Sequence, residues 1–196
     1  MSKFIINGQR PLKGEITVSG SKNAALKIFP VALLTHEPIK VFNVPEIEDI
    51  FRAQEMLIAL GHEVKKTGKG AFELKFKNQK SADLPAGLVN KFRASVMFVG
   101  PMLVKFGEVR FPHPGGCVIG AAMRPIDMFV DNFEKMGAKV ELSNNYYRLT
   151  AKKLKGADIF FHDITVTGTE SLMMTACLAD SETLLKNCAM EPEIVS

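Results

Sequence analysis

The chain repeats one order of secondary structure, and this repetition constrains its fold more than any other feature. In each unit, the pattern of apolar and turn-forming residues predicts a strand, a helix, a strand, an amphipathic helix and two further strands. Leu60-Gly61-His62-Glu63-Val64 in the first unit matches Met136-Gly137-Ala138-Lys139-Val140 in the second, with a glycine ending each helix. The period is roughly 75 residues, longer than the about 20 to 50 residues of common solenoid repeats. We therefore predict an α/β fold built from repeated β-α-β-α-β-β blocks.

A third block begins near residue 164 and stops early. Ile164-Thr165-Val166-Thr167-Gly168-Thr169 echoes Ile16-Thr17-Val18-Ser19-Gly20-Ser21, and Pro192-Glu193-Ile194 echoes Pro45-Glu46-Ile47. The sequence ends at Ser196, where the second helix of this block should begin. A sheet that lacks some of its strands has unpaired edges and uncovered apolar surface. We expect a fragment, or a subunit that something else completes.

Composition excludes several classes of protein. The 196 residues are 46% apolar and 23% charged, as in an ordinary globular protein, and the net charge of +4 is too diffuse for a nucleic-acid partner but suits small anionic ligands. No signal peptide or run of transmembrane length is present, so we expect a cytoplasmic protein without a membrane partner. The three cysteines show neither a disulfide framework nor metal-ligand spacing, and Cys177 and Cys188 are predicted to be small core residues.

A loop rich in glycine and proline joins a strand ending near Phe111 to a helix beginning near Pro125. Gly115 and Gly116 permit backbone geometries that can bring the Cys117 thiol close to a ligand. Arg124 precedes the helix, where free backbone N–H groups already favour an anion. The pattern suits a thiol that transfers a proton beside a bound phosphate. An ordinary turn cysteine and a solvated arginine are the alternative.

Residues at three predicted helix starts are further candidates for ligand binding. Lys22 and Asn23 follow the N-cap candidate Ser21, and Arg93 has the corresponding place in the second block. Cations at equivalent places suit a shared anion site, although a capped helix with solvated charges would look the same. Before the third helix, Asp163, Thr165 and Thr167 suit a sugar or a nucleotide, but Thr167 and Thr169 are equally plausible capping residues.

Five segments carry a resemblance to a known family: Ser19-Gly20-Ser21-Lys22-Asn23-Ala24-Ala25, Arg93-Ala94-Ser95, Pro114-Gly115-Gly116-Cys117, Arg124-Pro125-Ile126-Asp127 and Glu191-Pro192-Glu193-Ile194-Val195. In this order they resemble the N-terminal half of the UDP-N-acetylglucosamine 1-carboxyvinyltransferases, which are enolpyruvyl transferases of peptidoglycan synthesis. The resemblance implies an inside-out α/β barrel domain of three blocks, the third truncated here. Residues 1–21 would pack as strands with a missing second domain, and residues 22–196 would form the incomplete first domain.

The resemblance also implies substrates and roles, without a cofactor or a metal. Cys117 would donate a proton to C3 of phosphoenolpyruvate, and it would be the residue that fosfomycin alkylates. Lys22, Asn23 and Arg124 would bind phosphoenolpyruvate. The UDP-N-acetylglucosamine contacts would be Arg93, Arg124, Pro125, Ile126, Asp127, Met128, Asp163, Ile164, Thr165 and Val166.

The sequence departs from the family pattern in three respects. Ala122 and Met123 are two extra residues in the loop, and Asp163 stands where a lysine is common. The catalytic base of the family belongs to the second domain, so this chain alone is expected to be inactive. Two alternatives are a UDP-sugar-binding fragment without catalysis and a shikimate-pathway enolpyruvyl transferase, which lacks the Pro-Gly-Gly-Cys loop.

Overall fold

The computed structural model describes residues 3–91, 93–112, 127–143 and 146–195, with the side chains of helix α5 described from residue 130 onward. The first block contains helix α1 (Lys22–Val31), the 3-10 helix η1 (Ala32–Leu34), strand β1 (Ile39–Val41), helix α2 (Glu48–Ala59) and strands β2 (His62–Gly68) and β3 (Ala71–Phe76). Its sheet has the order β1-β3-β2, and both pairings are antiparallel.

The second block has the same order of elements. A short helix α3 (Ala86–Val89) and the 3-10 helix η2 (Arg93–Phe98) lead into α4 (Val99–Phe106), followed by β4 (Glu108–Pro112), α5 (Asp127–Lys135), β5 (Lys139–Ser143) and β6 (Tyr146–Thr150). The sheet order is β4-β6-β5, again antiparallel, and residues 82–84 run parallel to β4 on its other side.

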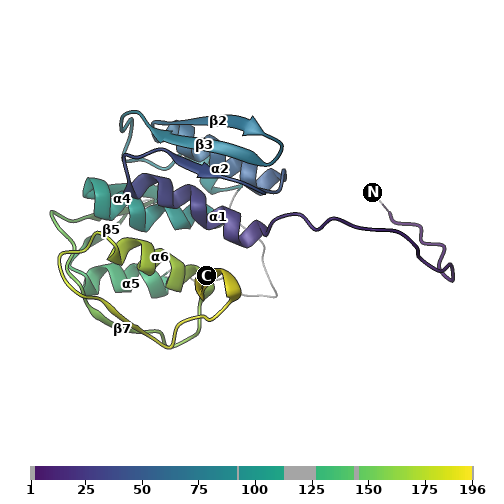
Figure 1. Ribbon diagram of the computed structural model, residues 1–196. Coiled ribbons are helices and arrows are strands. Elements are labelled where there is room, and N and C mark those ends of the chain that lie inside the picture. The colour runs from purple at the N-terminus through teal and green to yellow at the C-terminus, as the bar shows by residue number, and fades with distance from the viewer. Residues whose placement is uncertain (1–2, 92, 113–126, 144–145, 196) are drawn as a thin grey trace.

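The third block contains β7 (Asp158–Phe160), α6 (Val166–Ala176), β8 (Leu184–Lys186) and α7 (Pro192–Val195), with β7 and β8 paired in parallel. Helices α1, α4, α5 and α6 lie between the sheet of the first block and the β7 strand region (Figure 1). One apolar core joins all three blocks, and its largest fully buried side chains include Phe29, Phe98, Phe111, Phe133 and Phe161. Among the described helices, none combines the length and apolar character that a membrane crossing requires.

The predicted α/β fold of repeated blocks is confirmed. The predicted helix start after Ser21 and the glycines that end two of the helices are confirmed as well. Gly61 and Gly137 have φ values of 103° and 93°, a left-handed backbone that glycine adopts without strain. Pro30 lies inside α1, and the chain changes to 3-10 geometry two residues later, because proline supplies no N–H to the helix. In the second block, α4 runs through Gly100 and Pro101 uninterrupted, since Pro101 lies in the first turn, where its missing N–H costs nothing.

Two predictions of local structure are wrong. The strands predicted within residues 1–21 do not form in the described residues 3–20, which instead extend away from the body without a neighbouring strand to supply hydrogen bonds (Figure 1). Cys177 is exposed, with its Sγ donating to the Met173 carbonyl oxygen at 3.3 Å, and Cys188 is only half-buried. Cys177 follows the last residue of α6, one turn after the exposed Met173, so it lies on the exposed side of the helix despite its apolar neighbours in sequence.

The sequence match between the first and third blocks differs by four residues from the match that the structure shows. Thr165, and not Thr169, is the N-cap of α6: its Oγ1 accepts from Gly168 N at 3.1 Å, as Ser21 Oγ accepts from Ala24 N at 3.3 Å. Thr169 is buried one turn later, where its Oγ1 accepts from Ala189 N at 3.1 Å. Ser21 is therefore the structural counterpart of Thr165.

Candidate functional site

The first candidate is the N-terminus of α1. Lys22 and Asn23 are both exposed in its first turn, and no acidic residue precedes them in that turn. Lys22 Nζ lies 3.1 Å from Asp49 Oδ2 at the start of α2, with both side chains about half exposed. Backbone N–H groups of the first turn and two exposed polar side chains therefore lie at the same helix end, which is a setting that can bind a phosphate or a carboxylate.

The second candidate, Arg93, is half-buried at the start of η2 and has an interaction partner. Two residues later, Ser95 is fully buried, and its Oγ has no hydrogen-bond partner within the described part of the chain. The 3-10 helix η2 packs against both α1 and α6, so helices from all three blocks contact one another. A shared anion site formed by their N-termini stays a prediction.

The third candidate is the segment before α6. Asp163 lines a cavity of about 250 Å³, together with Phe160 to His162 and the α5 residues Asp131, Asn132 and Lys135. Lys135 Nζ donates to Asn132 Oδ1 at 3.2 Å. Ile164 is largely exposed, whereas Thr165 and Val166 are half-buried at the helix start. Sequence reasoning did not find the three α5 residues, whose only signal was the helical continuation after Asp127.

The predicted loop is not tested. Cys117, Arg124, Pro125 and Ile126 lie outside the described residues, and Asp127 and Met128 are described only as the first two residues of α5. The distances from the Cys117 thiol to Lys22 and Arg93 therefore stay predictions.

A buried ion pair was missed by the sequence analysis. Lys27 Nζ on α1 lies 3.1 Å from Glu170 Oε1 on α6, and the Glu170 side chain is only 6% exposed. Burial raises the pKa of Glu170; the hydrogen bond and charge of Lys27 oppose that rise, while Glu193 and Glu191 add to it. The only sequence signal was a glutamate within an otherwise uncharged helix.

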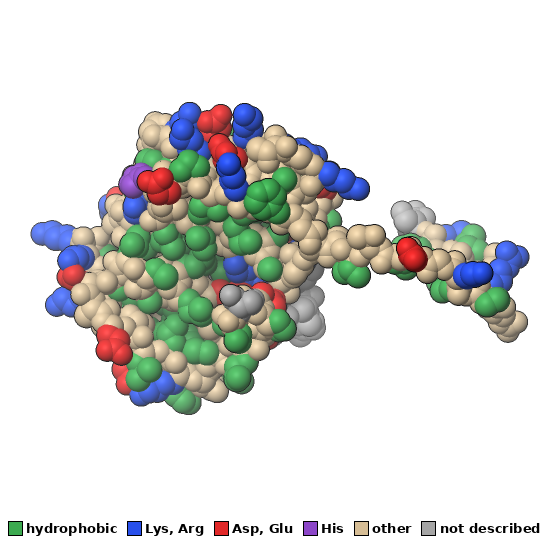
Figure 2. Space-filling model, viewed as in Figure 1, with side chains coloured by type: hydrophobic (Ala, Val, Ile, Leu, Met, Phe, Trp, Pro, Cys, Tyr) green, Lys and Arg blue, Asp and Glu red, His purple; other side chains and the backbone are tan. Residues whose placement is uncertain are grey.

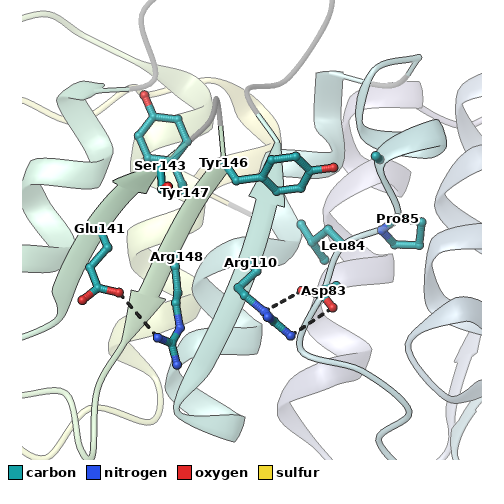
Figure 3. A pocket seen from close by; sticks show the side chains of 10 residues that line it. Asp83, Leu84, Pro85, Arg110, Glu141, Ser143, Tyr146, Tyr147 and Arg148 are labelled. Atoms are coloured by element: carbon teal, nitrogen blue, oxygen red, sulfur yellow. Dashed lines mark hydrogen bonds and ion pairs between the residues drawn. The ribbon is translucent and has the colours of Figure 1, made fainter.

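Another cavity, of about 570 Å³, opens beside β4 and β6 (Figure 3). Asp83 binds Arg110 through both carboxylate oxygens, with Oδ1 2.6 Å from Nε and Oδ2 3.1 Å from Nη2. Arg148 lies 2.9 Å from Glu108 Oε1 and 3.5 Å from Glu141 Oε2. Three carboxylates thus neutralise two guanidinium groups, so this cavity is a poor anion site despite its arginines.

The pKa values of two ionisable groups in that cavity are shifted by their hydrogen-bond partners. Hydrogen bonding to Glu108 raises the pKa of Arg148, and hydrogen bonding from Lys139 lowers the pKa of Glu141. Within the described residues, no three histidine, cysteine, aspartate or glutamate side chains lie close enough together to hold a metal ion.

Comparison with known proteins gives a consistent result. Residues 6–196 match the family model described as EPSP synthase (3-phosphoshikimate 1-carboxyvinyltransferase). Proteins named UDP-N-acetylglucosamine 1-carboxyvinyltransferase are 44% identical over 99% of this chain in Koribacter versatilis and 45% identical over all of it in Desulfatibacillum aliphaticivorans. The chain spans only 45% and 46% of the length of these two relatives.

Two solved structures share the fold. The enolpyruvyl transferase NikO from Streptomyces tendae superimposes with a TM-score of 0.80 at 19% identity, over 94% of this chain and 43% of NikO. EPSP synthase from Acinetobacter baumannii gives a TM-score of 0.74 at 16% identity, over 96% of this chain and 44% of the synthase. At these identities, the likeness concerns the fold alone.

Proposed function

Because the chain belongs to the EPSP synthase family, we propose that it is the N-terminal part of an enzyme that transfers the enolpyruvyl group of phosphoenolpyruvate to the 3-hydroxyl of UDP-N-acetylglucosamine. The observation that carries this proposal is the identity of 44% to 46% with proteins named for that reaction, along essentially the whole chain. That identity favours a UDP-sugar over 3-phosphoshikimate as the acceptor. The reaction belongs to peptidoglycan synthesis in the cytoplasm.

The chemistry requires a proton donor and a set of cations. A proton is added to C3 of phosphoenolpyruvate, and the sugar oxygen forms a bond to C2 as it loses its own proton. The bond from C2 to the phosphate oxygen then breaks, phosphate leaves, and loss of a proton from C3 restores the double bond. Cations that surround the phosphate and the carboxylate stabilise the charge that develops.

The candidate residues fit these tasks. Lys22 and Asn23 at the exposed start of α1, with Arg124, hold phosphoenolpyruvate, and Cys117 donates the proton to C3. The UDP-sugar contacts come from Arg93, residues 124–128 and residues 163–166. The closeness of α5 to the segment before α6 supports a common ligand for the last two groups.

A second domain completes the enzyme in this proposal. Residues 1–21 pack against that domain, and residues 22–196 form the first domain. The 196-residue chain by itself binds UDP-N-acetylglucosamine without turnover. The extended residues 3–20 support this division, and so does the chain's span of only 45% to 46% of the length of its relatives.

Binding is tested by calorimetry with UDP-N-acetylglucosamine. Ile164→Glu places a negative charge beside the proposed diphosphate and should weaken binding severalfold. Leu184→Glu, at another exposed apolar position of the third block, is the matched control and should bind like the parent chain. Equal affinities for the two variants would remove residues 163–166 from the site.

The role of Cys117 is tested by alkylation. Fosfomycin, incubated with the chain in the presence of UDP-N-acetylglucosamine, should form a covalent adduct at Cys117, located by mass spectrometry. Cys177 is an exposed thiol in the same chain and serves as the internal control. A reaction no faster at Cys117 than at Cys177 would contradict its activation and support the reading of the chain as a non-catalytic UDP-sugar-binding fragment.

A further inference from the structure

A buried histidine distinguishes the first block from the second. Gly61-His62 and Gly137-Ala138 have equivalent places, because each glycine has a left-handed backbone after a helix and is followed by a strand of the sheet. His62 is 4% exposed and Ala138 is 9% exposed. The fold therefore accepts a small apolar side chain at this position, and the first block instead buries a group that can gain a proton near neutral pH.

The imidazole of His62 joins strand β2 to the segment that ends helix α1. Its Nε2 lies 3.1 Å from the carbonyl oxygen of Ala32, the first residue of η1, which continues directly from α1. A carbonyl oxygen only accepts hydrogen bonds, so Nε2 carries a hydrogen and donates it. In the neutral ring, Nδ1 then has a bare lone pair.

The Nδ1 atom of His62 is buried, and it has no hydrogen-bond partner within the described residues. Burial lowers the pKa of His62; the hydrogen bond to Ala32 opposes that fall, and the charge of His36 adds to it. A proton on Nδ1 would create a buried N–H without an acceptor and a positive charge in the interior. Both are unfavourable, so the closed structure favours the neutral ring.

Aromatic rings pack against His62 and link it to a second histidine. Phe76 on β3 meets the His62 ring edge-on, with the ring centroids 5.3 Å apart, and it meets the His36 ring edge-on at 4.7 Å. Phe106 on α4 stacks on Phe76 at 6.3 Å. These rings offer no acceptor for a hydrogen on Nδ1, and a positive charge on His36 disfavours a second one on His62.

The charged groups on the surrounding elements do not offset a charge on His62. Three carboxylates of these elements are exposed or bound to other bases: Glu37 after η1, Glu55 on α2 with Arg52, and Glu63 on β2 with Lys77. On β3, Glu73 and Lys75 project from the opposite face of the sheet, since they alternate with the inward side chains. On α4, Lys105 Nζ donates to a carbonyl oxygen of η1 at 3.3 Å, which adds a positive charge beside η1.

We propose that His62 is a proton-sensitive link between η1 and β2: the neutral ring holds the end of α1 on the sheet, and protonation at mildly acidic pH releases it. Below the pKa of a free histidine, about 6.5, the open state binds a proton that the closed state excludes. Opening therefore becomes more favourable as the pH falls, by at most about tenfold per pH unit. The release acts on the helix whose exposed start carries Lys22 and Asn23, but the inference does not depend on the proposed enzymatic activity.

Hydrogen exchange of the 196-residue chain, followed by NMR at about pH 7.5 and about pH 5.5 and corrected for intrinsic rates, tests the proposal. At the lower pH, the opening equilibrium constant for amides of η1 and the start of β2 should rise severalfold, and those of β4 to β6 should change much less. His62→Gln keeps an N–H donor for Ala32 but does not titrate, so it should abolish the rise. His162→Gln, at an exposed histidine of the third block, is the matched control and should leave the rise unchanged. No rise in the parent chain, or the same rise in His62→Gln, would overturn the proposal.

The imidazole of His62 provides a second test that needs no variant. Ring-nitrogen NMR spectra of the parent chain should show the neutral tautomer with its hydrogen on Nε2 and a bare Nδ1. The ring should stay neutral in the closed state at about pH 6, where most of a free histidine is protonated. A hydrogen on Nδ1, or a positive ring in the closed state at that pH, would contradict the proposal even if His62→Gln did not fold. An equal rise in exchange throughout β4 to β6 would assign the opening to the whole chain and would contradict a local link.

Discussion

Helices α1 and α6 begin in the same way but differ in what their first turns expose. A hydroxyl from an extended N-cap accepts the N–H three residues later in each helix. The first turn of α1 then exposes Lys22 and Asn23, whereas α6 is buried continuously from Gly168 to Leu172. The same cap therefore precedes an exposed first turn in one block and a helix whose residues 168–172 are buried in the other.

The two helices are joined by the Lys27–Glu170 ion pair. Glu170 is buried one turn into α6, and its Oε2 has no hydrogen-bond partner within the described residues. Placing a carboxylate there is unfavourable, and Lys27 compensates for part of that cost. The burial of α6 is thus coupled to a cation that α1 supplies.

Removing that cation should have the largest effect on stability. Lys27→Met leaves Glu170 buried without its partner and should lower the free energy of unfolding by about 3–5 kcal/mol at neutral pH, measured by urea denaturation. Lys27→Met with Glu170→Leu removes both charges and is the matched control. If the single variant were as stable as the double variant, Lys27 would not compensate the buried charge.

The pH dependence of the Lys27→Met variant follows from the raised pKa of Glu170. Between the unfolded-state pKa and the raised native pKa, the native state binds more protons, so stability falls as pH increases through this window. Loss of Lys27 removes an influence that lowers this pKa and should steepen the fall. Glu170→Gln should abolish this pH dependence of the stability. If the steep fall in stability persisted in Glu170→Gln, another titrating group would be its cause.

A core truncation in α6 should have the next largest effect. Leu172 is fully buried, so Leu172→Ala should cost about 3 kcal/mol, through lost apolar contacts and a cavity. Met173, the next residue along the helix, is 40% exposed, and Met173→Ala should cost much less. Similar urea midpoints for the two variants would contradict the burial difference between the two faces.

Removing the caps should cost about 1 kcal/mol for each helix. The Thr165 cap is part-buried and the Ser21 cap is exposed, so Thr165→Ala should destabilise more than Ser21→Ala in thermal unfolding. Thr165→Ser and Ser21→Asp keep a capping oxygen and should recover most of the loss. A greater cost at Ser21 would reverse the order expected from burial.

Sequence reasoning succeeded where local chemistry decides the structure. The Ser21 cap and the glycines after α2 and α5 were predicted because each satisfies a requirement of its own helix end. Thr165 was harder to identify, since Thr169 offers the same hydroxyl one turn later. The two are distinguished only by the hydrogen bond that Ala189 N donates to Thr169 Oγ1, and these residues lie 20 positions apart in the sequence.

Features that depend on distant partners could not be predicted from local patterns. Residues 14–19 alternate as a strand does, yet a strand requires a neighbour, and none lies beside them. The Lys27–Glu170 pair joins two helices far apart in the sequence, without a spacing rule to connect them. For the candidate site, the positions of Lys22 and Arg93 at helix starts are confirmed, while the Cys117 loop stays a prediction.

The smallest effect on stability is expected at the exposed start of α1, where it sharpens the contrast with α6. The Lys22–Asp49 pair is half exposed, so Asp49→Asn should change the free energy of unfolding by less than about 1 kcal/mol. The same variant removes a carboxylate that competes with a bound anion for Lys22, and it should tighten phosphoenolpyruvate binding about threefold to fivefold in an NMR titration. Glu48→Gln removes a neighbouring charge that pairs with Arg52 and should leave that affinity close to that of the parent chain. Equal affinities for the two variants would mean that Lys22 does not contact the ligand.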